Sequence, residues 1–262
     1  MSSIDRDGVA IHYDVTGAGD GDGTTVLLSH GYCATSRMFA STVAALSGSR
    51  RCITWDVRGH GRSDYPSDAG QYSVELTVGD MVAILDAEDV DRAILIGHSM
   101  GGYLSLELQR THPGRVAALV LVGTGPGYRR DDTRAAWNDM CDAFAVALET
   151  KGLDGMPSVS DEVRASDHRE AVGLAHAARG ILRQRDARVI EHLPDIDVPT
   201  LVVVGEKDRQ FLAGGSYMAA KIPGARHAVI DGAGHAPMLT HPGPFLEEVS
   251  SFVGSVDSAA RN

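Results

Sequence analysis

Short, continuous runs of apolar residues recur in the first half of the chain, separated by longer stretches in which apolar residues return every three or four positions. The first pattern is typical of strands covered on both faces of a sheet, and the second is typical of amphipathic helices. Strand and helix alternate three times, which indicates parallel strands joined by right-handed crossovers. The buried runs are Thr25–Ser29, Cys52–Trp55, Ala93–Ile96 and Val116–Val122.

The pattern is more polar at the N-terminus. Asp7-Gly8 separates a short N-terminal strand from Val9–Thr16, whose rough alternation suits a half-buried strand in a hairpin. Between the buried runs, helices are expected over Met38–Leu46 and from Ser73 through Leu85.

The alternation stops at Tyr128, and up to about Pro194 there is helical spacing but no strand candidate. It then resumes, and the tail Ser255–Asn262 is expected to be frayed. We therefore predict an α/β core domain formed by residues 1–127 and 195–262, with a helical cap inserted at residues 128–194. The later elements are a strand over Thr200–Asp208, a helix over Leu212–Lys221, a strand over Ala228–Ile230 and a last helix over about Pro244–Val253.

An apolar stripe in the cap has two interpretations. Trp137, Met140, Phe144 and Leu148 lie at helical spacing and form either the packing face of the cap or the roof of a substrate pocket. In the first case the pocket is expected along Tyr32, Phe211 and Met238. In the second case the pocket residues are Tyr32, Trp137, Met140, Phe144, Phe211 and Met238.

Composition narrows the class of protein. At 262 residues, 43% of them hydrophobic, the chain is long enough to bury a full core. The net charge of −11 disfavours nucleic acid and anionic membranes as partners, and no apolar run is long enough to span a bilayer. The three cysteines form no Cys-x-x-Cys pair, so neither a metal site nor a disulfide framework is expected. Together with an N-terminus that lacks an apolar signal core, this predicts a cytoplasmic protein.

The stretch Gly97-His98-Ser99-Met100-Gly101 follows a buried strand and precedes a helical pattern. A serine at such a sharp turn has a strained backbone, and side chains two residues before and after it would collide, so glycine is needed at both positions. The turn would expose the Ser99 hydroxyl at the carboxyl edge of the sheet, beside the free N–H groups of a helix start. The pattern Gly-x-Ser-x-Gly is weak by itself, but in this context it predicts a nucleophile.

A serine nucleophile needs a base, and the base needs a group that orients it. His235 lies in a glycine-rich loop after the last strand, and Asp208 lies at the end of the strand before it. The order Ser, Asp, His is the order used by this architecture. An acid after the strand that ends near Gly123 is the alternative, and the first carboxylate there is Asp131.

Acyl transfer also needs two N–H donors for the developing oxyanion. Met100 supplies one, and Tyr32, in the turn after Thr25–Ser29, is the candidate for the other. The Tyr32 phenol either lines the pocket or covers the sheet edge. Asp56 is expected to hold its own loop through hydrogen bonds to backbone groups.

With these motifs in place, the chain resembles the α/β-hydrolase superfamily from about residue 4 to residue 253. The resemblance implies an eight-stranded, mostly parallel sheet with helices on both faces, a helical cap, a Ser99–His235–Asp208 triad and no cofactor. Serine rather than aspartate at position 99 is unlike the haloalkane dehalogenases and epoxide hydrolases. The resemblance rests on His30-Gly31-Tyr32, on Asp56–Ser63, on Gly97–Gly102, and on Gly205–Asp208 with Gly232–His235.

The sequence thus predicts a serine hydrolase that cleaves a small or medium carboxylic ester or lactone through an acyl-enzyme on Ser99. A carbon–carbon bond hydrolase or a perhydrolase with the same triad is one alternative, and a ligand-binding receptor without turnover is another. The sequence does not indicate which ester or lactone is cleaved, or the oligomeric state.

Overall fold

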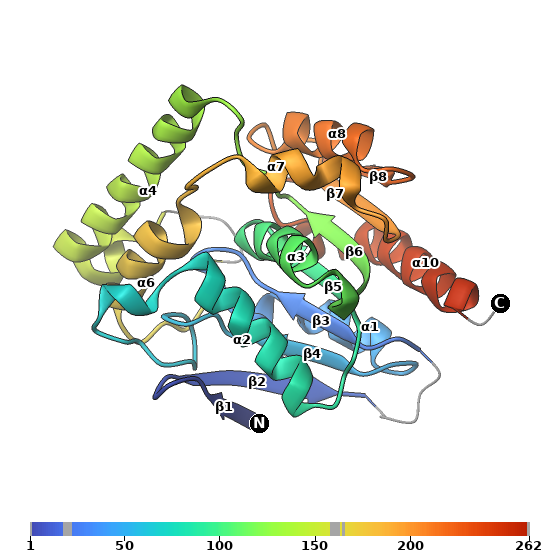
Figure 1. Cartoon of the computed structure of the whole chain (residues 1–262), viewed down its shortest axis with the longest axis horizontal. Helices are drawn as coiled ribbons and strands as arrows, with labels where there is room; N and C mark the ends of the chain where they lie inside the picture. The colour runs from blue at the N-terminus through green and yellow to red at the C-terminus, as the bar shows by residue number, and fades with distance from the viewer. Residues whose placement is uncertain (1, 18–22, 158–162, 164–165, 261–262) are drawn as a thin grey trace.

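One mixed sheet forms the centre of the molecule (Figure 1). The computed structural model describes residues 2–17, 23–157, 163 and 166–260, and within these ranges eight strands lie in the order β1-β2-β4-β3-β5-β6-β7-β8. The first two strands pair antiparallel, and so do β2 and β4, whereas all other neighbours are parallel. The predicted eight-stranded, mostly parallel sheet is confirmed. The strands are β1 Ser2–Asp5, β2 Ala10–Thr16, β3 Val26–Ser29, β4 Cys52–Trp55, β5 Ala93–His98, β6 Val116–Val122, β7 Thr200–Gly205 and β8 Arg226–Ile230.

Helices cover both faces of the sheet. Leu27 of β3 packs in the same apolar cluster as residues of α2, α3 and α8, whereas Val26 and Leu28 pack with residues of α1 and α10. The central strands are therefore buried on both faces, which explains their continuous apolar runs. The helices of the core are α1 Ala40–Leu46, α2 Val74–Ala87, α3 Met100–Thr111, α8 Leu212–Lys221, α9 Pro237–Thr240 and α10 Pro242–Ala260, with 3₁₀ turns η1 Ser36–Phe39, η2 Ala69–Gln71 and η3 Pro113–Arg115.

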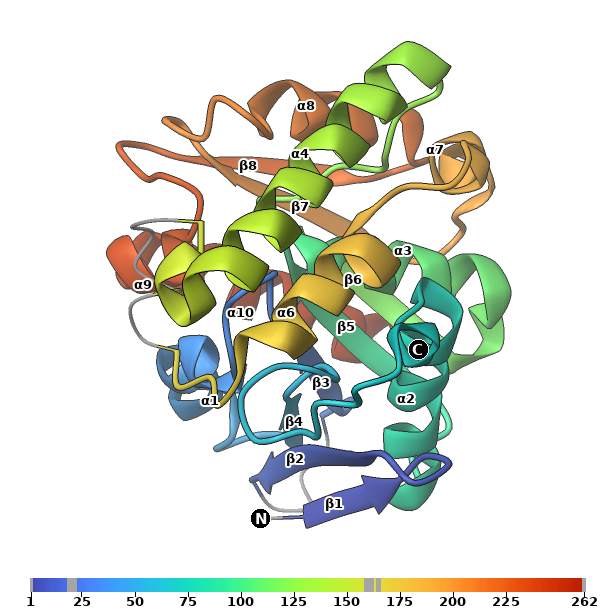
Figure 2. The ribbon, with the colours of Figure 1, turned by 90° about the vertical axis from the view of Figure 1, so that its left-hand side faces the viewer.

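The cap lies across the side of the sheet where the parallel strands end. Figure 2 shows α4 passing in front of β7 and β8 and α6 passing in front of β5 and β6. In the described part of residues 128–194 there are helices and turns but no strand, as the sequence indicates. The boundaries of the cap as a separate domain stay a prediction. Its elements are α4 Asp131–Lys151, η4 Gly152–Gly155, α6 Ala171–Ala177, the π-helical turn η5 Ala178–Leu182, α7 Arg188–His192 and η6 Leu193–Asp195.

The C-terminal segment differs from its prediction. The last helix does not fray at Ser255 but continues to Ala260. Val256 and Asp257 are buried, and the Asp257 carboxylate lies 2.9 Å from Nη1 of the buried Arg50 and accepts a hydrogen bond from the Thr24 N–H. A partner 207 residues earlier in the chain thus keeps the last turns helical, and the local pattern did not reveal it. None of the described helices is both long enough and apolar enough to cross a membrane.

Candidate active site

Ser99 lies between β5 and α3 with backbone angles φ 51° and ψ −115°. This region is strained for a residue with a side chain and is kept when surrounding bonds over-determine it. The Ser99 N–H donates to the Val122 carbonyl (2.9 Å), and the Ser99 carbonyl accepts from the Thr124 hydroxyl (2.7 Å). The neighbouring strand β6 therefore holds the turn in place.

The two glycines of the motif are required by close backbone approach. A Cβ at Gly97 would lie 2.6 Å from the Gly102 Cα and would overlap the Gly101 carbonyl. A Cβ at Gly101 would overlap the Ser29 carbonyl oxygen on β3 and lie 2.8 Å from that of His30. Any side chain at these positions would push the start of α3 away from the sheet and move Ser99.

His235 and Asp208 come together as the sequence predicts. The His235 Nδ1–H donates to Asp208 Oδ2 at 2.8 Å, which leaves Nε2 as the acceptor nitrogen of the neutral ring. A Cβ at Gly123 would lie 3.4 Å from Asp208 Oδ2 and 3.2 Å from His235 Nδ1. The end of β6, where the alternative acid was sought, therefore lies beside this pair but carries no carboxylate. Asp131 begins α4, and its carboxylate pairs with Arg134 on the surface.

Aromatic rings surround the His235 imidazole. Phe211 stacks on one side of it, with ring centroids 5.0 Å apart and planes 22° apart, and His98 lies 4.6 Å away on another. The His98 Nε2–H also donates to the His235 carbonyl at 3.0 Å. Burial lowers the pKa of His98 well below its usual value, so this ring is neutral near pH 7. Asp208 thus orients the His235 ring through Nδ1, Phe211 packs against its face, and His98 holds its backbone carbonyl.

The predicted oxyanion donors belong to segments next to Ser99: Met100 follows it in the chain, and a Cβ at Gly31, the residue before Tyr32, would lie 3.2 Å from the Ser99 Cβ. Among the described residues, no hydrogen bond is made by the backbone N–H of Tyr32 or of Met100, the first residue of α3. The Met100 donor at the start of α3 and the Tyr32 donor in the turn after β3 are therefore both available to an anion. No hydrogen bond joins Ser99 to His235 among the described bonds, but both side chains line the same hollow.

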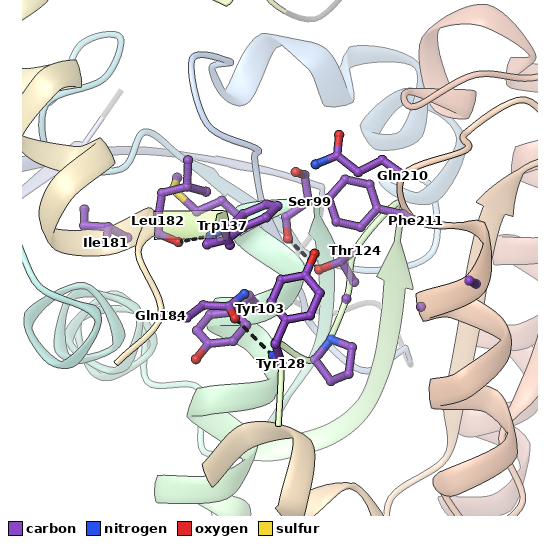
Figure 3. A pocket seen from close by; sticks show the side chains of 16 residues that line it. Ser99, Tyr103, Thr124, Tyr128, Trp137, Ile181, Leu182, Gln184, Gln210 and Phe211 are labelled. Atoms are coloured by element: carbon purple, nitrogen blue, oxygen red, sulfur yellow. Dashed lines mark hydrogen bonds between the residues drawn. The ribbon is translucent and has the colours of Figure 1, made fainter. Parts of the chain in front are cut away.

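Two hollows bounded by described residues meet at Ser99. They share Ser99, Trp137, Leu182, Gln210 and Phe211 as walls. The first has a volume of about 190 Å³ and extends past Met100 toward the end of β6, while the second, of about 160 Å³, extends past His235. Figure 3 shows the first hollow, with Ser99 and Gln210 at its upper end. Its further lining includes Tyr103, Thr124, Tyr128, Ile181 and Gln184, and that of the second includes Tyr32, Met140, Phe144, Pro157 and Val163.

Trp137 lines both hollows and is fixed by the π-helical turn of the cap. Its indole N–H donates to the Leu182 carbonyl at 2.9 Å. Next to it, the Asn138 side-chain amide and the Gln184 backbone exchange two hydrogen bonds, each of 2.9 Å. These three bonds join α4 to the end of η5 and hold the Trp137 side chain at the hollows.

The apolar stripe of α4 serves both uses that the sequence left open. Trp137, Met140 and Phe144 line the hollows, whereas Leu148 is buried against Ala145 and other residues of the cap. The Tyr32 phenol stacks on Phe144, at 6.1 Å between centroids, and donates to the Leu174 carbonyl of α6 at 3.0 Å. It lines the second hollow and contacts the cap at the same time.

Met238 is the one predicted pocket residue that the structure places elsewhere. Its side chain is buried with Phe39 and Phe245 in the core cluster on the α1 and α10 face of the sheet. The turn of α9, which begins at Pro237, directs it away from Ser99.

Sequence reasoning missed much of this lining, including five polar side chains: Tyr103, Thr124, Tyr128, Gln184 and Gln210. Two of them carried a usable signal, since Thr124 follows the end of β6 and Gln210 comes two residues after Asp208.

Buried polar groups hold the loops beneath the site. Asp56 accepts hydrogen bonds from the N–H groups of Ser36 (2.8 Å) and Arg62 (3.0 Å), as predicted. Burial acts to raise the pKa of Asp56, but nearby His30 and these bonds lower it below its usual value. The His30 Nδ1–H donates to the Gly31 carbonyl at 2.7 Å, and its Nε2 accepts from Val57 at 3.0 Å. The turn that carries Tyr32 is therefore anchored from below. Within the described residues, no three His, Cys, Asp or Glu side chains are grouped to hold a metal ion.

Comparison with known proteins places this geometry among enzymes. A family model described as "Alpha/beta hydrolase family" matches residues 26–248. A protein of Bacillus subtilis (strain 168) is 29% identical over 94% of this chain and 96% of its own length. It is provisionally named a 2-succinyl-6-hydroxy-2,4-cyclohexadiene-1-carboxylate synthase. A protein of Variovorax paradoxus (strain S110), provisionally named a carbamate hydrolase, is 35% identical over 76% of this chain and 78% of its own. The crystal structure of the enol-lactonase from Burkholderia xenovorans LB400 has a TM-score of 0.76, with 26% identity over 97% of this chain and all of that one.

Proposed function

Since the chain belongs to the alpha/beta hydrolase family, we propose that it is a serine hydrolase that cleaves a small or medium, uncharged carboxylic ester or lactone. The observation that carries this proposal is the strained Ser99 at the start of α3, in one hollow with a His235 imidazole that donates to Asp208. The names of these relatives cover several reactions. The size and lining of the hollows narrow the substrate class of this chain.

The proposed reaction follows from the positions of the donors and acceptors. His235 Nε2 accepts the hydroxyl proton as Ser99 Oγ bonds to the substrate carbonyl carbon. The N–H groups of Tyr32 and Met100 stabilise the negative charge on the carbonyl oxygen. The protonated His235 gives its proton to the leaving oxygen as the carbon–oxygen bond breaks. Water, deprotonated by His235, then cleaves the acyl-enzyme and regenerates Ser99.

The two hollows receive the two parts of the substrate in this proposal. The leaving oxygen takes its proton from His235, so the leaving group belongs in the hollow that His235 lines. The acyl group then occupies the hollow beyond Met100. At about 190 Å³, this hollow is smaller than the roughly 300–1,000 Å³ of ordinary ligand pockets, which supports a small or medium acyl group.

The lining of the hollows supports an uncharged substrate. No Asp, Glu, Lys or Arg occurs among the described residues that line either of them. A carboxylate in the acyl hollow would leave water without a cationic partner there, which is unfavourable. The polar groups present are neutral ones, including Tyr128, Gln184 and Gln210. The free cysteines, all three of which are buried, fit the cytoplasm as the proposed location.

Pre-steady-state hydrolysis of a substrate panel tests this proposal. The panel holds p-nitrophenyl esters with acyl chains of two to ten carbons, γ- and δ-lactones, one anionic ester and one vinylogous diketone. We expect a burst of nitrophenol from wild type and none from Ser99→Ala, with the anionic ester the slowest ester. Turnover of the diketone alone would favour carbon–carbon bond hydrolysis instead, and no turnover of any substrate would favour a receptor.

A further inference from the structure

Three consecutive residues of the cap, Asp167–Arg169, each contact loops of the core, and we call this segment the strap. Asp167 forms an ion pair with Arg37 of η1 at 2.9 Å. The Arg169 guanidinium lies 4.8 Å from the centre of the Tyr65 ring and donates to the Ser63 carbonyl. The strap therefore ties the cap to the loops that follow β3 and β4.

His168, the central residue of the strap, makes two hydrogen bonds to different core loops. Its Nδ1 accepts from the Gly61 N–H at 3.1 Å, and its Nε2–H donates to the Cys33 carbonyl at 2.9 Å. Both bonds require the neutral ring with its proton on Nε2. The imidazole is thus a bridge between two loops that no local sequence pattern links to it.

Cys33 comes directly after Tyr32, in the turn that carries the proposed oxyanion donor. Its φ of 57° lies in the left-handed region, which is unfavourable for a residue with a side chain. The peptide on the N-terminal side of this turn is held by His30 at the Gly31 carbonyl, and the one on the C-terminal side is held by His168 at the Cys33 carbonyl. The Tyr32 N–H belongs to the same peptide unit as the Gly31 carbonyl, and the His168 bond holds the peptide two residues further on, so the two anchors together restrain the turn that carries this donor.

We propose that His168 is a positioning residue for the oxyanion site, which aims the Tyr32 N–H through the Cys33 carbonyl and completes the site when the cap is in place. This inference rests on the proposed function. Its chemical consequence is specific: the Tyr32 N–H gains its strongest interaction when the carbonyl oxygen becomes negative, so a misdirected donor weakens the transition state more than substrate binding.

Two isosteric substitutions separate the two bonds of His168. In His168→Gln the side-chain Nε2 can still donate to the Cys33 carbonyl, whereas in His168→Asn the Oδ1 can still accept from the Gly61 N–H but the donor to Cys33 is lost. Asp167→Asn is the matched control, because it removes the Arg37 ion pair from the same strap without touching the Cys33 turn.

We expect His168→Asn to lower kcat by about tenfold or more with KM changed less than about twofold, the split that marks an interaction made in the transition state. His168→Gln should keep kcat within about threefold of wild type, and Asp167→Asn should match wild type. Hydrogen–deuterium exchange of the peptide that contains Gly31–Ser36 should be faster in His168→Asn than in His168→Gln, a readout that needs no substrate.

Equal kcat in His168→Asn and wild type would overturn the inference, and so would equal losses in His168→Asn and Asp167→Asn, which would indicate general loosening of the cap. The inference would also be overturned if His168→Gln had a kcat as low as that of His168→Asn, or if its Gly31–Ser36 peptide exchanged as fast. If the wild type hydrolyses no ester, the proposed function fails, and the exchange comparison still decides whether His168 holds the turn.

Discussion

The backbone of Ser99 is strained, and neighbouring hydrogen bonds together with two glycines allow the fold to keep this conformation. Its φ of 51° is held by bonds to Val122 and Thr124, and Gly97 and Gly101 let the turn pack against β3. Sequence reasoning located this residue because the glycine requirement is local. It misplaced Met238 because the direction of that side chain depends on the first residue of α9, which periodicity does not resolve.

At the same scale, Asp208→Asn should lower kcat by about 10⁴ without unfolding the protein, because an amide at this position favours the wrong His235 tautomer, as in serine proteases. The 2.8 Å bond to His235 Nδ1 is the basis for this expectation. Steady-state kinetics measure the effect, and circular dichroism checks the fold. Asp131→Asn, on the surface of α4, should change kcat less than twofold. The reverse ranking of the two variants would place the orienting acid on the β6 side.

The elements of the cap were predictable in kind, but their individual contacts were not. Helical spacing predicted α4 and its apolar stripe, yet the division of the stripe between hollow and core follows from where α6 and η5 lie. The clip between Asn138 and Gln184 spans 46 residues and has no local signature. Strand ends, by contrast, led to Asp208 and His235, which lie in hydrogen-bond contact because parallel strands bring their carboxyl ends to one edge.

Shortening the Trp137 side chain of α4, which lines both hollows, should change acyl-chain selectivity. Trp137→Ala should shift the ratio of kcat/KM for a long against a short acyl chain by about tenfold toward the long chain, since each methylene contact is worth roughly 1–3 kcal/mol. Phe144→Ala, on the His235 side, should instead change the ranking of leaving groups at constant acyl chain. Both series use matched nitrophenyl and alkyl esters. Identical acyl profiles in Trp137→Ala and wild type would contradict the assignment of the acyl hollow.

The π-helical turn offers a stability test. A Cβ at Gly180 would overlap the Tyr72 carbonyl oxygen, so Gly180→Ala should push η5 from the start of α2 and destabilise the protein by roughly 1–3 kcal/mol. Gly254→Ala in α10 is the control, because a Cβ there meets nothing within 4 Å and alanine favours a helix by about 1 kcal/mol. Denaturant unfolding compares the two. Equal stability of both variants would mean that the cap does not pack tightly on α2.

For the whole molecule, three buried neutral histidines make stability depend on pH. Burial lowers the pKa of His30 to about 4 and the pKa values of His60 and His98 well below 6.5. These groups are fully neutral in the native state at pH values where the unfolded chain binds protons. The unfolded state therefore gains protons first as the pH falls, and native stability decreases.

We expect the free energy of unfolding to fall between pH 7 and pH 5, by up to about 1.4 kcal/mol per pH unit for each such histidine below pH 6.5. For His30 the loss should level off near pH 4, where the native ring also becomes protonated. Urea unfolding at intervals of half a pH unit gives the slope. A free energy that stays constant from pH 7 to pH 5 would show that these rings take up protons at the same pH in the native and unfolded states.

The proposed mechanism depends on the nucleophilic reactivity of Ser99. Intact-protein and peptide mass spectrometry after treatment with a fluorophosphonate measures it directly, with Ser99→Ala and heat-unfolded wild type as controls. We expect one adduct per chain, on the peptide that contains Ser99, absent from both controls and formed more slowly in Asp208→Asn. An adduct on another serine, or equal labelling of native and unfolded protein, would contradict it.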